Sequence, residues 1–233
     1  MKLPLRYVWE SLLFLVYPRI CVACSRDLSY REEVLCTPCF RLLPETGFHL
    51  TGGLEMTNKF RELGHVSRAA AFLFFKKEGM VQQLVHSIKY QEQTQVATQL
   101  GIWYGAQLKA ANWFPEADFI VPVPLHRRKQ QERGYNQAWY FALGLQDGLQ
   151  VTARQHILKR TRYTESQTHK TKQERRENVK HAFSVPERGS VLGKHILLAD
   201  DVMTTGATLD ACAETLLKAG AASVGVVTLA YAT

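Results

Sequence analysis

The chain has 233 residues, of which 46% are hydrophobic and 21% are charged. This composition can bury a core, so disorder throughout is excluded, and the length suits one large domain or a small module joined to an ordinary domain. The net charge of the chain is +8. Residues 126–181 hold 13 basic and 5 acidic side chains, so this segment alone accounts for the whole net positive charge. An anionic partner facing this segment would explain the surplus, although a solvated basic face would also do so.

Apolar residues from Leu5 to Val16 recur at three- and four-residue steps, which predicts an amphipathic helix ended by Pro18. Its opposite face is not rich in lysine or arginine, so packing against the protein is favoured over lying on a membrane surface. The longest strongly apolar run, Leu12–Tyr17, is too short to cross a bilayer or to indicate a secretory signal. We therefore expect a cytoplasmic protein without a membrane span.

Four of the five cysteines form two close pairs, Cys21 with Cys24 and Cys36 with Cys39. In a reducing compartment this spacing favours a metal site over disulfides. Four thiolates can enclose zinc in a tetrahedron and leave no position for a reactive water, so we expect a structural zinc ion. A redox dithiol or an iron–sulfur cluster is the alternative. Cys212 falls in an apolar helical stretch and is expected in the core.

The rest of the chain alternates between strand-like and helix-like patterns. Glycines at 52, 53 and 64 indicate a connector, and a basic loop is expected directly after the apolar run 119–123. The alternation predicts a parallel sheet, whose ligands bind beyond the carboxyl ends of its strands. The expected strands are at about 69–75, 119–123, 196–199 and 223–229, and the expected helices at about 80–90, 96–111, 136–149 and 209–219.

A buried strand ending at Ala199 delivers two adjacent carboxylates, Asp200 and Asp201, to that edge of the sheet. The segment 204–208 then turns into a helix N-terminus, where free amides and threonine hydroxyls suit a phosphate. Gly206 allows the backbone to approach a ligand closely, and the carboxylates can accept hydrogen bonds from sugar hydroxyls or from magnesium-bound waters. These features predict a cradle for ribose 5-phosphate, with an ordinary capped helix beside a solvated acidic pair as the alternative.

This segment resembles the phosphoribosyl pyrophosphate (PRPP) motif of type I phosphoribosyltransferases, and the chain resembles the competence protein F (ComF) family. The resemblance implies an α/β fold with the parallel sheet of type I phosphoribosyltransferases at 51–233, joined to an N-terminal helix and four-cysteine zinc module at 1–50. Relatives are linked to DNA uptake during natural transformation, and no well-defined nucleobase acceptor is associated with the family. Besides the cysteines and the PRPP motif, the resemblance rests on Ile88-Lys-Tyr90, Pro122-Val-Pro-Leu-His126, Arg133-Gly-Tyr-Asn-Gln137, Gln167, Arg175, Asn178-Val179 and Phe183.

The resemblance also implies which residues form the site. Asp200 and Asp201 would be the catalytic pair that contacts the ribose hydroxyls, with magnesium bound together with PRPP. Pyrophosphate would lie against the loop Pro124–Arg128. The 5-phosphate loop would consist of Thr204, Thr205, Gly206, Ala207 and Thr208.

Basic residues that follow the second strand allow two interpretations. Cations at such a strand end could neutralise pyrophosphate as it leaves the sugar. They could instead contact the phosphates of a nucleic acid. The residues concerned are His126, Arg127, Arg128 and Arg133.

Residues 159–181, which include Arg175 and Arg176, are polar and lack apolar periodicity. This pattern is typical of a lid that excludes water from a reactive centre when it closes. The same stretch could instead follow the backbone of single-stranded DNA, with aromatic side chains stacked on the bases. The aromatic candidates are Tyr135, Trp139 and Tyr163, for which core packing is the alternative.

Two classes of function therefore remain open. As an enzyme, the protein would displace pyrophosphate from PRPP onto an acceptor that the sequence does not reveal. As a binding module, it would hold single-stranded DNA together with a DNA-uptake motor or a recombination-mediator protein. We favour a phosphoribosyltransferase-like competence protein that binds a PRPP-type ligand and takes part in DNA uptake.

Overall fold

The computed structural model describes residues 19–52, 54–61, 64–162, 179 and 181–232. The chain divides into two compact units, Met1–Leu43 and Pro44–Thr233, so the division precedes the 50/51 boundary expected from the sequence. The helix predicted over Leu5–Val16 lies outside the described residues, as does most of the basic segment 159–181.

Residues 19–43 of the first unit wind around the cysteines. An isolated antiparallel bridge pairs Ile20 with Asp27, and helix α2 (Thr37–Arg41) begins directly after Cys36. Pro38 stands in the first turn of α2, where a missing backbone N–H removes no helical hydrogen bond. A core of this size rarely stabilises a fold by itself, so the cysteines are the natural place for a cross-link through a metal ion. The buried apolar side chains of this region are Leu28, Val34, Leu35 and Leu43.

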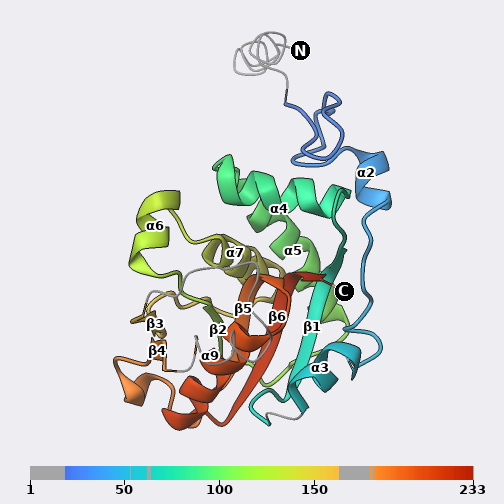
Figure 1. Cartoon of the computed structure of the whole chain (residues 1–233). Helices are drawn as coiled ribbons and strands as arrows, with labels where there is room; N and C mark the ends of the chain where they lie inside the picture. Colours follow the sequence, from blue (N-terminus) through green and yellow to red (C-terminus); the bar gives the residue numbers. More distant parts are fainter. Residues whose placement is uncertain (1–18, 53, 62–63, 163–178, 180, 233) are drawn as a thin grey trace, which may run out of the picture. The chain divides into compact units, whose positions relative to one another are not determined.

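A four-stranded sheet forms the centre of the second unit (Figure 1). Every pair of neighbouring strands is parallel, which confirms the sheet predicted from the alternation of strands and helices. Strand β6 and the first half of β5 are almost continuously apolar and buried, as is usual when helices cover both faces of a parallel sheet. The strand order is β1 (Arg68–Phe75), β6 (Ser223–Ala232), β5 (His195–Met203) and β2 (Phe119–Pro122).

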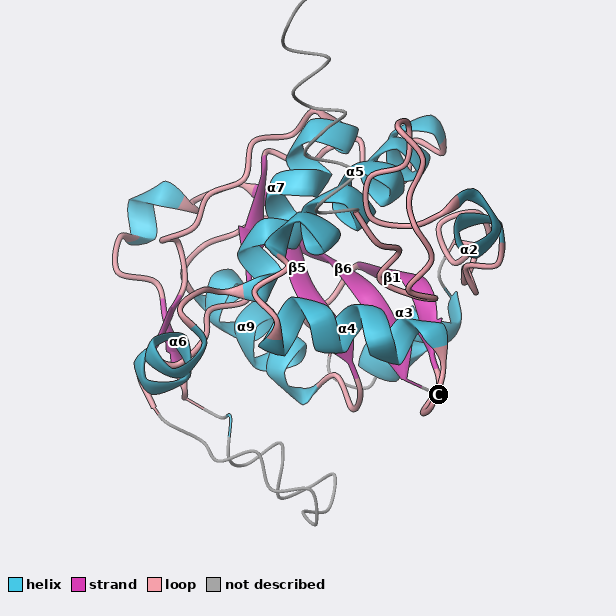
Figure 2. Ribbon diagram, turned by 90° about the horizontal axis from the view of Figure 1, so that it is seen from above, coloured by secondary structure: helices cyan, strands magenta, loops and turns pink. Residues whose placement is uncertain are grey.

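Helices cover both faces of this sheet (Figure 2). On one face lie α5 (Thr94–Ala110) and α7 (Gln137–Leu149), and on the other lie α3 (Leu54–Arg61) and α9 (Ala207–Lys218). Helix α4 (Met80–Tyr90) lies across the carboxyl ends of the strands. The four helices predicted from apolar spacing are confirmed, with ends that differ by at most a few residues.

Glycines allow α5 and α7 to pack backbone against backbone. A Cβ atom on Gly144 would lie 2.0 Å from the carbonyl oxygen of Thr98, and one on Gly101 would lie 2.5 Å from that of Phe141. Neither distance is compatible with a side chain larger than hydrogen. Helix α7, held against α5 in this way, also packs against β5 and β2.

Two segments that were expected to be loops are helical. The connector predicted around glycines 52, 53 and 64 contains α3, which places Met56 and Phe60 in the core with 0% and 1% exposure. The basic loop predicted after β2 is helix α6 (Arg127–Arg133). Its sequence consists of good helix formers, the His126 side chain accepts a hydrogen bond from the Arg128 N–H, and Gly134 ends the helix at φ 78°.

A two-stranded antiparallel sheet flanks the main sheet on the side of β2 (Figure 1). It pairs β3 (Lys159–Arg160) with β4 (Phe183–Ser184), and a 3₁₀ turn, η1 (Arg188–Ser190), follows. The long chain segment between β3 and β4 falls largely outside the described residues.

Within the part of the chain that the structure describes, no helix combines the length and the apolar character needed to cross a membrane.

Candidate functional site

The acidic pair lies where strand β5 loses a neighbour. β2 pairs with β5 only as far as Ala199, whereas β5 continues beside β6 to Met203. Asp200 and Asp201 are therefore the first residues of β5 that extend past the end of β2, at the carboxyl edge where ligands of parallel sheets bind. Both residues are only partly exposed. The sequence predicted this position, although it placed the end of the strand at Ala199.

The carboxyl group of Asp200 has an unusual acidity. Burial raises its pKa from 3.8 to about 7, and the negative charge of Asp201 acts in the same direction. The backbone N–H of Asp201, the ammonium group of Lys89 and the guanidinium group of Arg160 oppose this shift. Near neutral pH Asp200 can therefore either donate or accept a hydrogen bond, which suits contact with a hydroxyl group.

Asp201 is held by a residue from a distant part of the chain. The Nζ atom of Lys89, in the last turn of α4, lies 2.9 Å from Oδ2 of Asp201, and both side chains are mostly buried, at 21% and 17% exposure. The other oxygen, Oδ1, accepts a hydrogen bond from the N–H of Val202 at 2.6 Å. Sequence reasoning missed this role of Lys89, although the residue belongs to the Ile88-Lys-Tyr90 motif on which the family resemblance rests.

The segment after β5 has the form expected of a phosphate loop. Residues 204–206 bend sharply, and α9 begins at Ala207. Gly206 caps the helix with φ 78°, and a Cβ atom there would lie 3.0 Å from the Met203 side chain and 3.1 Å from that of Phe60. Glycine offers no capping side chain, and the N–H of Ala207 contacts only Oγ1 of Thr205, at a long 3.5 Å, so the amide end of α9 still suits an anion. Thr204 is exposed, whereas the side chains of Thr205 and Thr208 are half-buried.

Helix α6 presents its basic residues in two directions. Arg127 and Arg128 are exposed, and Arg128 pairs with Glu132 through Nε and Oε1 at 3.1 Å. Lys129 and Arg133, which are four residues apart and therefore share a face, are half-buried. Of the basic residues predicted as pyrophosphate or nucleic-acid contacts on this helix, the structure thus places Arg133 on the half-buried face and Arg127 and Arg128 on the exposed one.

Arg160 of β3 adds a cation that the sequence did not single out. Its guanidinium carbon lies 5.5 Å from the centre of the Phe183 ring, which places a cation over an aromatic face. Burial lowers the pKa of Arg160, and the negative charge of Asp200 acts against that shift. Arg160 therefore belongs to the electrostatic surroundings of the acidic pair.

Several predicted site residues serve other roles or lie outside the described residues. His126 caps α6 through its Nδ1 atom, which accepts from the N–H of Arg128 at 3.2 Å. The hydroxyl of the half-buried Tyr135 donates to the carbonyl oxygen of Ile88. Arg175, Arg176 and Tyr163 lie in the segment that the structure does not describe.

The four cysteines of the first unit converge on one point. Their sulfur atoms all lie within 4.8 Å of one another, and the Sγ atoms of Cys24 and Cys36 are 3.7 Å apart. Four sulfurs at about 2.3 Å from a zinc ion form a tetrahedron with edges of about 3.8 Å, so the cluster has the dimensions of a tetrathiolate zinc site. Cys212, by contrast, is fully buried in α9, as predicted.

The thiols of this cluster differ in acidity. Burial opposes ionisation of Cys21, but hydrogen bonds from backbone N–H groups, first that of Cys36, lower its pKa to about 7. Burial and the neighbouring sulfurs raise the pKa of Cys39. One thiolate therefore forms readily near neutral pH, and a bound cation would stabilise the others.

Similarity to known proteins is consistent with this geometry. The family described as phosphoribosyl transferase domain matches residues 138–233, which include β5, the phosphate loop, β6 and all of α7 except its first residue. The protein named DNA utilization protein YhgH from Escherichia coli O157:H7 is 31% identical over 212 residues, covering 89% of this chain and 88% of the relative. Competence protein F from Haemophilus influenzae is 38% identical over 119 residues, which is 51% of each chain.

Solved structures show weaker similarity. A glutamine PRPP amidotransferase from B. subtilis shares 25% identity over 62% of this chain and 26% of its own length, with a TM-score of 0.39. A hypoxanthine phosphoribosyltransferase from Staphylococcus aureus shares 17% identity over 59% of this chain and 64% of its own, with a TM-score of 0.38.

The extended match to the DNA utilization proteins, the match to Competence protein F and the phosphoribosyl transferase domain together establish the affiliation. The parallel sheet and the four-cysteine cluster give the fold class that the sequence predicted. The chain belongs to the competence protein F (ComF) family, with a type I phosphoribosyltransferase fold and an N-terminal four-cysteine module.

Proposed function

We propose that the protein binds a PRPP-type ligand at the carboxyl end of β5. The observation that carries this proposal is that the acidic pair and the phosphate loop occupy one continuous strand-to-helix turn. The amides of the first turn of α9 would hold the 5-phosphate, with Thr205 and Thr208 as hydroxyl donors. Asp200 and Asp201 would accept hydrogen bonds from the ribose hydroxyls.

The same arrangement could support transfer of the phosphoribosyl group. In that reaction the bond between C1 of the ribose and the pyrophosphate oxygen breaks, pyrophosphate leaves with the bonding electron pair, and an acceptor atom forms a new bond to C1. Asp200 and Asp201 would hold the sugar in place, and cations beside them would stabilise the charge that develops on pyrophosphate. The acceptor is not specified by this site, so ligand binding is the part of the proposal that can be tested first.

Magnesium fits the site only as a partner of the ligand. The two carboxylates can hydrogen-bond to magnesium-bound waters, and magnesium in phosphate sites commonly relies on one or two carboxylates together with the phosphates. When bound, the ion would neutralise part of the negative charge of the pyrophosphate.

We further propose that the protein takes part in DNA uptake during natural transformation. The supporting observation is its membership of a family whose relatives are named competence and DNA utilization proteins. The exposed face of α6, with Arg127 and Arg128, would contact single-stranded DNA, and Arg175 and Arg176 would extend that contact. A DNA-uptake motor or a recombination mediator would be the protein partner.

The four cysteines would hold a structural zinc ion. All four positions of the tetrahedron are then filled, so this ion would stabilise the first unit and would not activate water. We place the protein in the cytoplasm, where reducing conditions keep the thiols available for the metal.

The ligand proposal is tested by calorimetric titration of the full chain with ribose 5-phosphate and with PRPP plus magnesium. Asp201→Asn should weaken both interactions about tenfold, because a charged acceptor is replaced by a neutral one. The matched control is Asp118→Asn, since Asp118 also pairs with a lysine, Lys194 at 2.8 Å, but lies next to the amino end of β5. Absence of saturable binding, or equal weakening by both substitutions, would contradict the proposal.

A further inference from the structure

A cavity of about 710 Å³ lies at the amino end of β1, which is the end of the parallel sheet opposite the acidic pair. Its volume is within the range of cavities that bind small molecules. Its described walls come from residues 49–52, the first half of α3, residues 64–68 and residues 111–113, all of them in the second unit. A ligand in this cavity would therefore occupy a site separate from the one proposed for ribose 5-phosphate.

Part of the wall of this cavity is apolar and remains in contact with water. Leu50 and Leu54 are 74% and 60% exposed, whereas Val66 and Trp113 are buried. Covering exposed apolar side chains with an apolar group is favourable, because it removes their surface from water. The cavity therefore favours a ligand with an apolar body.

Two hydroxyl groups of the wall already have partners within the protein. The hydroxyl of Ser67 donates to the carbonyl oxygen of Val224 at 3.0 Å, and that of Thr57 accepts from the N–H of Ala69 at 2.8 Å. Because these hydrogen bonds are internal, the two hydroxyls offer little to a ligand that is itself rich in hydroxyl groups, such as a sugar. This also favours an apolar ligand body.

Arg68 gives the cavity a fixed positive charge. Its Nη1 atom donates to the carbonyl oxygen of Trp113, and its guanidinium carbon lies 5.8 Å from the centre of the Phe114 ring. A guanidinium group held by two such contacts loses little freedom when it binds an anion. Its other N–H groups have no hydrogen-bond partner in the part of the chain that the structure describes.

The charge of Arg68 is not neutralised by a neighbouring acid. The described wall residues include no aspartate or glutamate. Within the described ranges, no carboxylate forms an ion pair with Arg68 within 4.0 Å. Because Arg68 is half-buried, its charge is screened less than that of an exposed arginine. An anionic group of a ligand would therefore be a favourable partner for Arg68.

His49 is the other described wall residue that can carry a positive charge near neutral pH. Burial lowers its pKa from 6.5, and the negative charge of Glu45 opposes this shift. The imidazole is therefore neutral at neutral pH. The described walls then carry one full positive charge, which suits a monoanion better than a phosphate dianion.

We infer that the cavity at the amino end of β1 binds a small monocarboxylate with an apolar body. The guanidinium group of Arg68 binds the carboxylate, because the two planar groups can form parallel hydrogen bonds. The side-chain amide of the exposed Asn112 supplies a further donor. The apolar body lies against Leu50 and Leu54 and shields them from water.

The test uses 4-phenylbutyrate as the probe and the full chain as the protein. The matched neutral probe is 4-phenylbutanamide, which has the same apolar body without the charge. Titration with 4-phenylbutyrate should cause saturable shifts in the backbone NMR signals of residues 49–52, 64–68 and 111–113. Its affinity should be about tenfold higher than that of the amide, because a charge-assisted contact is added. Absence of saturable shifts at these residues, or equal affinity for the two probes, would overturn the inference.

Substitutions in the wall locate the interaction. Arg68→Gln should weaken binding of 4-phenylbutyrate about tenfold and leave binding of the amide nearly unchanged. Since Arg68 also bonds to Trp113, a second variant avoids that contact: Leu54→Glu places a negative charge at an exposed wall position and should repel the carboxylate. The matched control is Leu192→Glu, which changes another exposed leucine outside the cavity. Equal effects of the two glutamate variants, or wild-type affinity in Arg68→Gln, would refute the assignment.

Two further titrations separate this site from other sources of the same chemistry and from the sugar site. A peptide that ends in an apolar residue also presents a carboxylate beside an apolar group, so the tripeptide alanyl-alanyl-leucine is titrated in the same way. If it binds more than about tenfold more tightly than 4-phenylbutyrate, the cavity captures a chain end and the assignment to a small molecule is wrong. Ribose 5-phosphate should not compete with 4-phenylbutyrate, and competition between them would place the probe in the sugar site and contradict the inference.

Discussion

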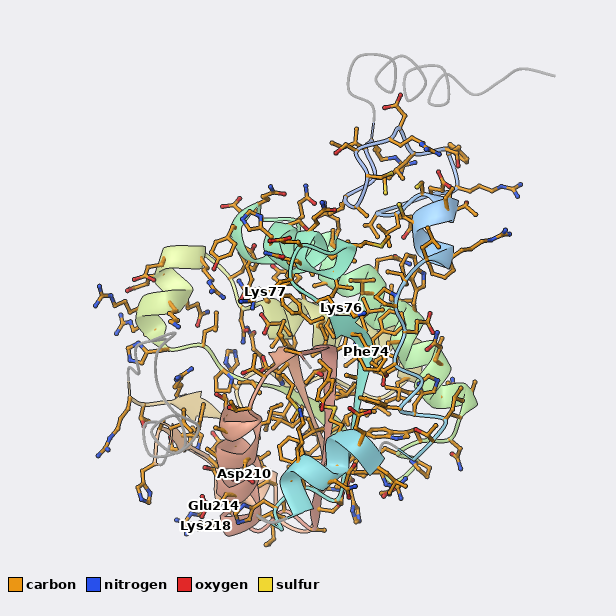
Figure 3. All side chains as sticks on the ribbon, turned by 45° about the vertical axis from the view of Figure 1, so that its right-hand side comes forward. Phe74, Lys76, Lys77, Asp210, Glu214 and Lys218 are labelled. Carbon is orange, nitrogen blue, oxygen red and sulfur yellow. The ribbon has the colours of Figure 1, made fainter. Side chains whose placement is uncertain are left out.

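The Nζ atom of Lys89 lies 2.9 Å from Oδ2 of Asp201, so the end of α4 is tied to the carboxyl end of β5. Figure 3 also shows an ion pair within α9, where Nζ of Lys218 lies 2.6 Å from Oε1 of Glu214. These two residues are only one helical turn apart in sequence, and the Lys218 side chain is 67% exposed. The Lys89–Asp201 pair is mostly buried and joins distant segments. Its two charges act on the neighbouring carboxyl group of Asp200 in opposite directions, because Asp201 raises the pKa of Asp200 and Lys89 lowers it.

Removal of Lys89 should make Asp200 a weaker acid. The ammonium group favours the ionised form of Asp200, so Lys89→Met should raise the pKa of Asp200 above its value of about 7. NMR titration of the side-chain carboxyl carbon measures this shift. Lys218→Met is the control and should leave that titration unchanged; the same curve in wild type and Lys89→Met would show that the pair has no electrostatic effect on Asp200.

The raised pKa of Asp200 should make the protein less stable as the pH rises. Between about pH 4 and about pH 7 the folded state keeps a proton on Asp200 that the unfolded state has lost, so the free energy of unfolding falls across this window. The asparagine of Asp200→Asn cannot ionise. This variant should therefore lack the fall in the free energy of unfolding that Asp200 causes, which is on the order of 1 to 3 kcal/mol. Urea unfolding at pH values below and above the window tests the prediction, and parallel curves for the two proteins would contradict it.

Metal removal should affect the first unit more than the second. The sulfurs of Cys21, Cys24, Cys36 and Cys39 are spaced for one tetrahedral ion, and the first unit has only a small apolar core. A chelator should therefore release one zinc ion per chain, expose four thiols to titration and broaden the NMR signals of residues 19–43, while the second unit still unfolds cooperatively. Loss of cooperative unfolding in both units at once would show that they depend on each other. Absence of zinc from the purified protein would contradict the assignment of the metal.

Gly144 should tolerate no side chain. A Cβ atom would lie 2.0 Å from the carbonyl oxygen of Thr98, so Gly144→Ala must separate α7 from α5. We expect a loss of about 1 to 3 kcal/mol in the free energy of unfolding, as is typical of overpacking. Gly189→Ala is the control, because a Cβ atom there meets no heavy atom within 4 Å and its φ is not positive. Chemical denaturation measures both variants, and similar stabilities would mean that the helices can separate without cost.

Single-stranded DNA binding should depend on salt and on the outer face of α6. If about five phosphates are contacted, the slope of log affinity against log salt should be about −3.5. Arg127→Glu should weaken binding to the same extent for all base sequences, because contacts to phosphates do not distinguish bases. Arg188→Glu reverses the charge of another exposed arginine and serves as the control. Fluorescence anisotropy with labelled oligonucleotides gives both quantities, and a slope near zero would argue against an electrostatic groove.

The main sheet could be predicted from sequence because its signals are local. A buried parallel strand is a short apolar run, and a covering helix repeats its apolar residues every three or four positions. The two missed helices show the limits of this approach. Glycines at both ends of α3 resembled a connector, and the charged sequence of α6 has almost no apolar periodicity, so the capping by His126 and Gly134 became visible only in the structure.

The sequence by itself determined the strand-borne acidic pair, the glycine turn that follows it and the paired cysteines, because each of these depends on residues that are close together in the chain. Only the tertiary structure decided that Lys89 reaches Asp201, that Arg160 acts on Asp200, and that Lys129 is turned inward whereas Arg127 is turned outward. The first two relationships join helices and strands that are distant in sequence, and all three depend on burial, which is a property of the packed chain.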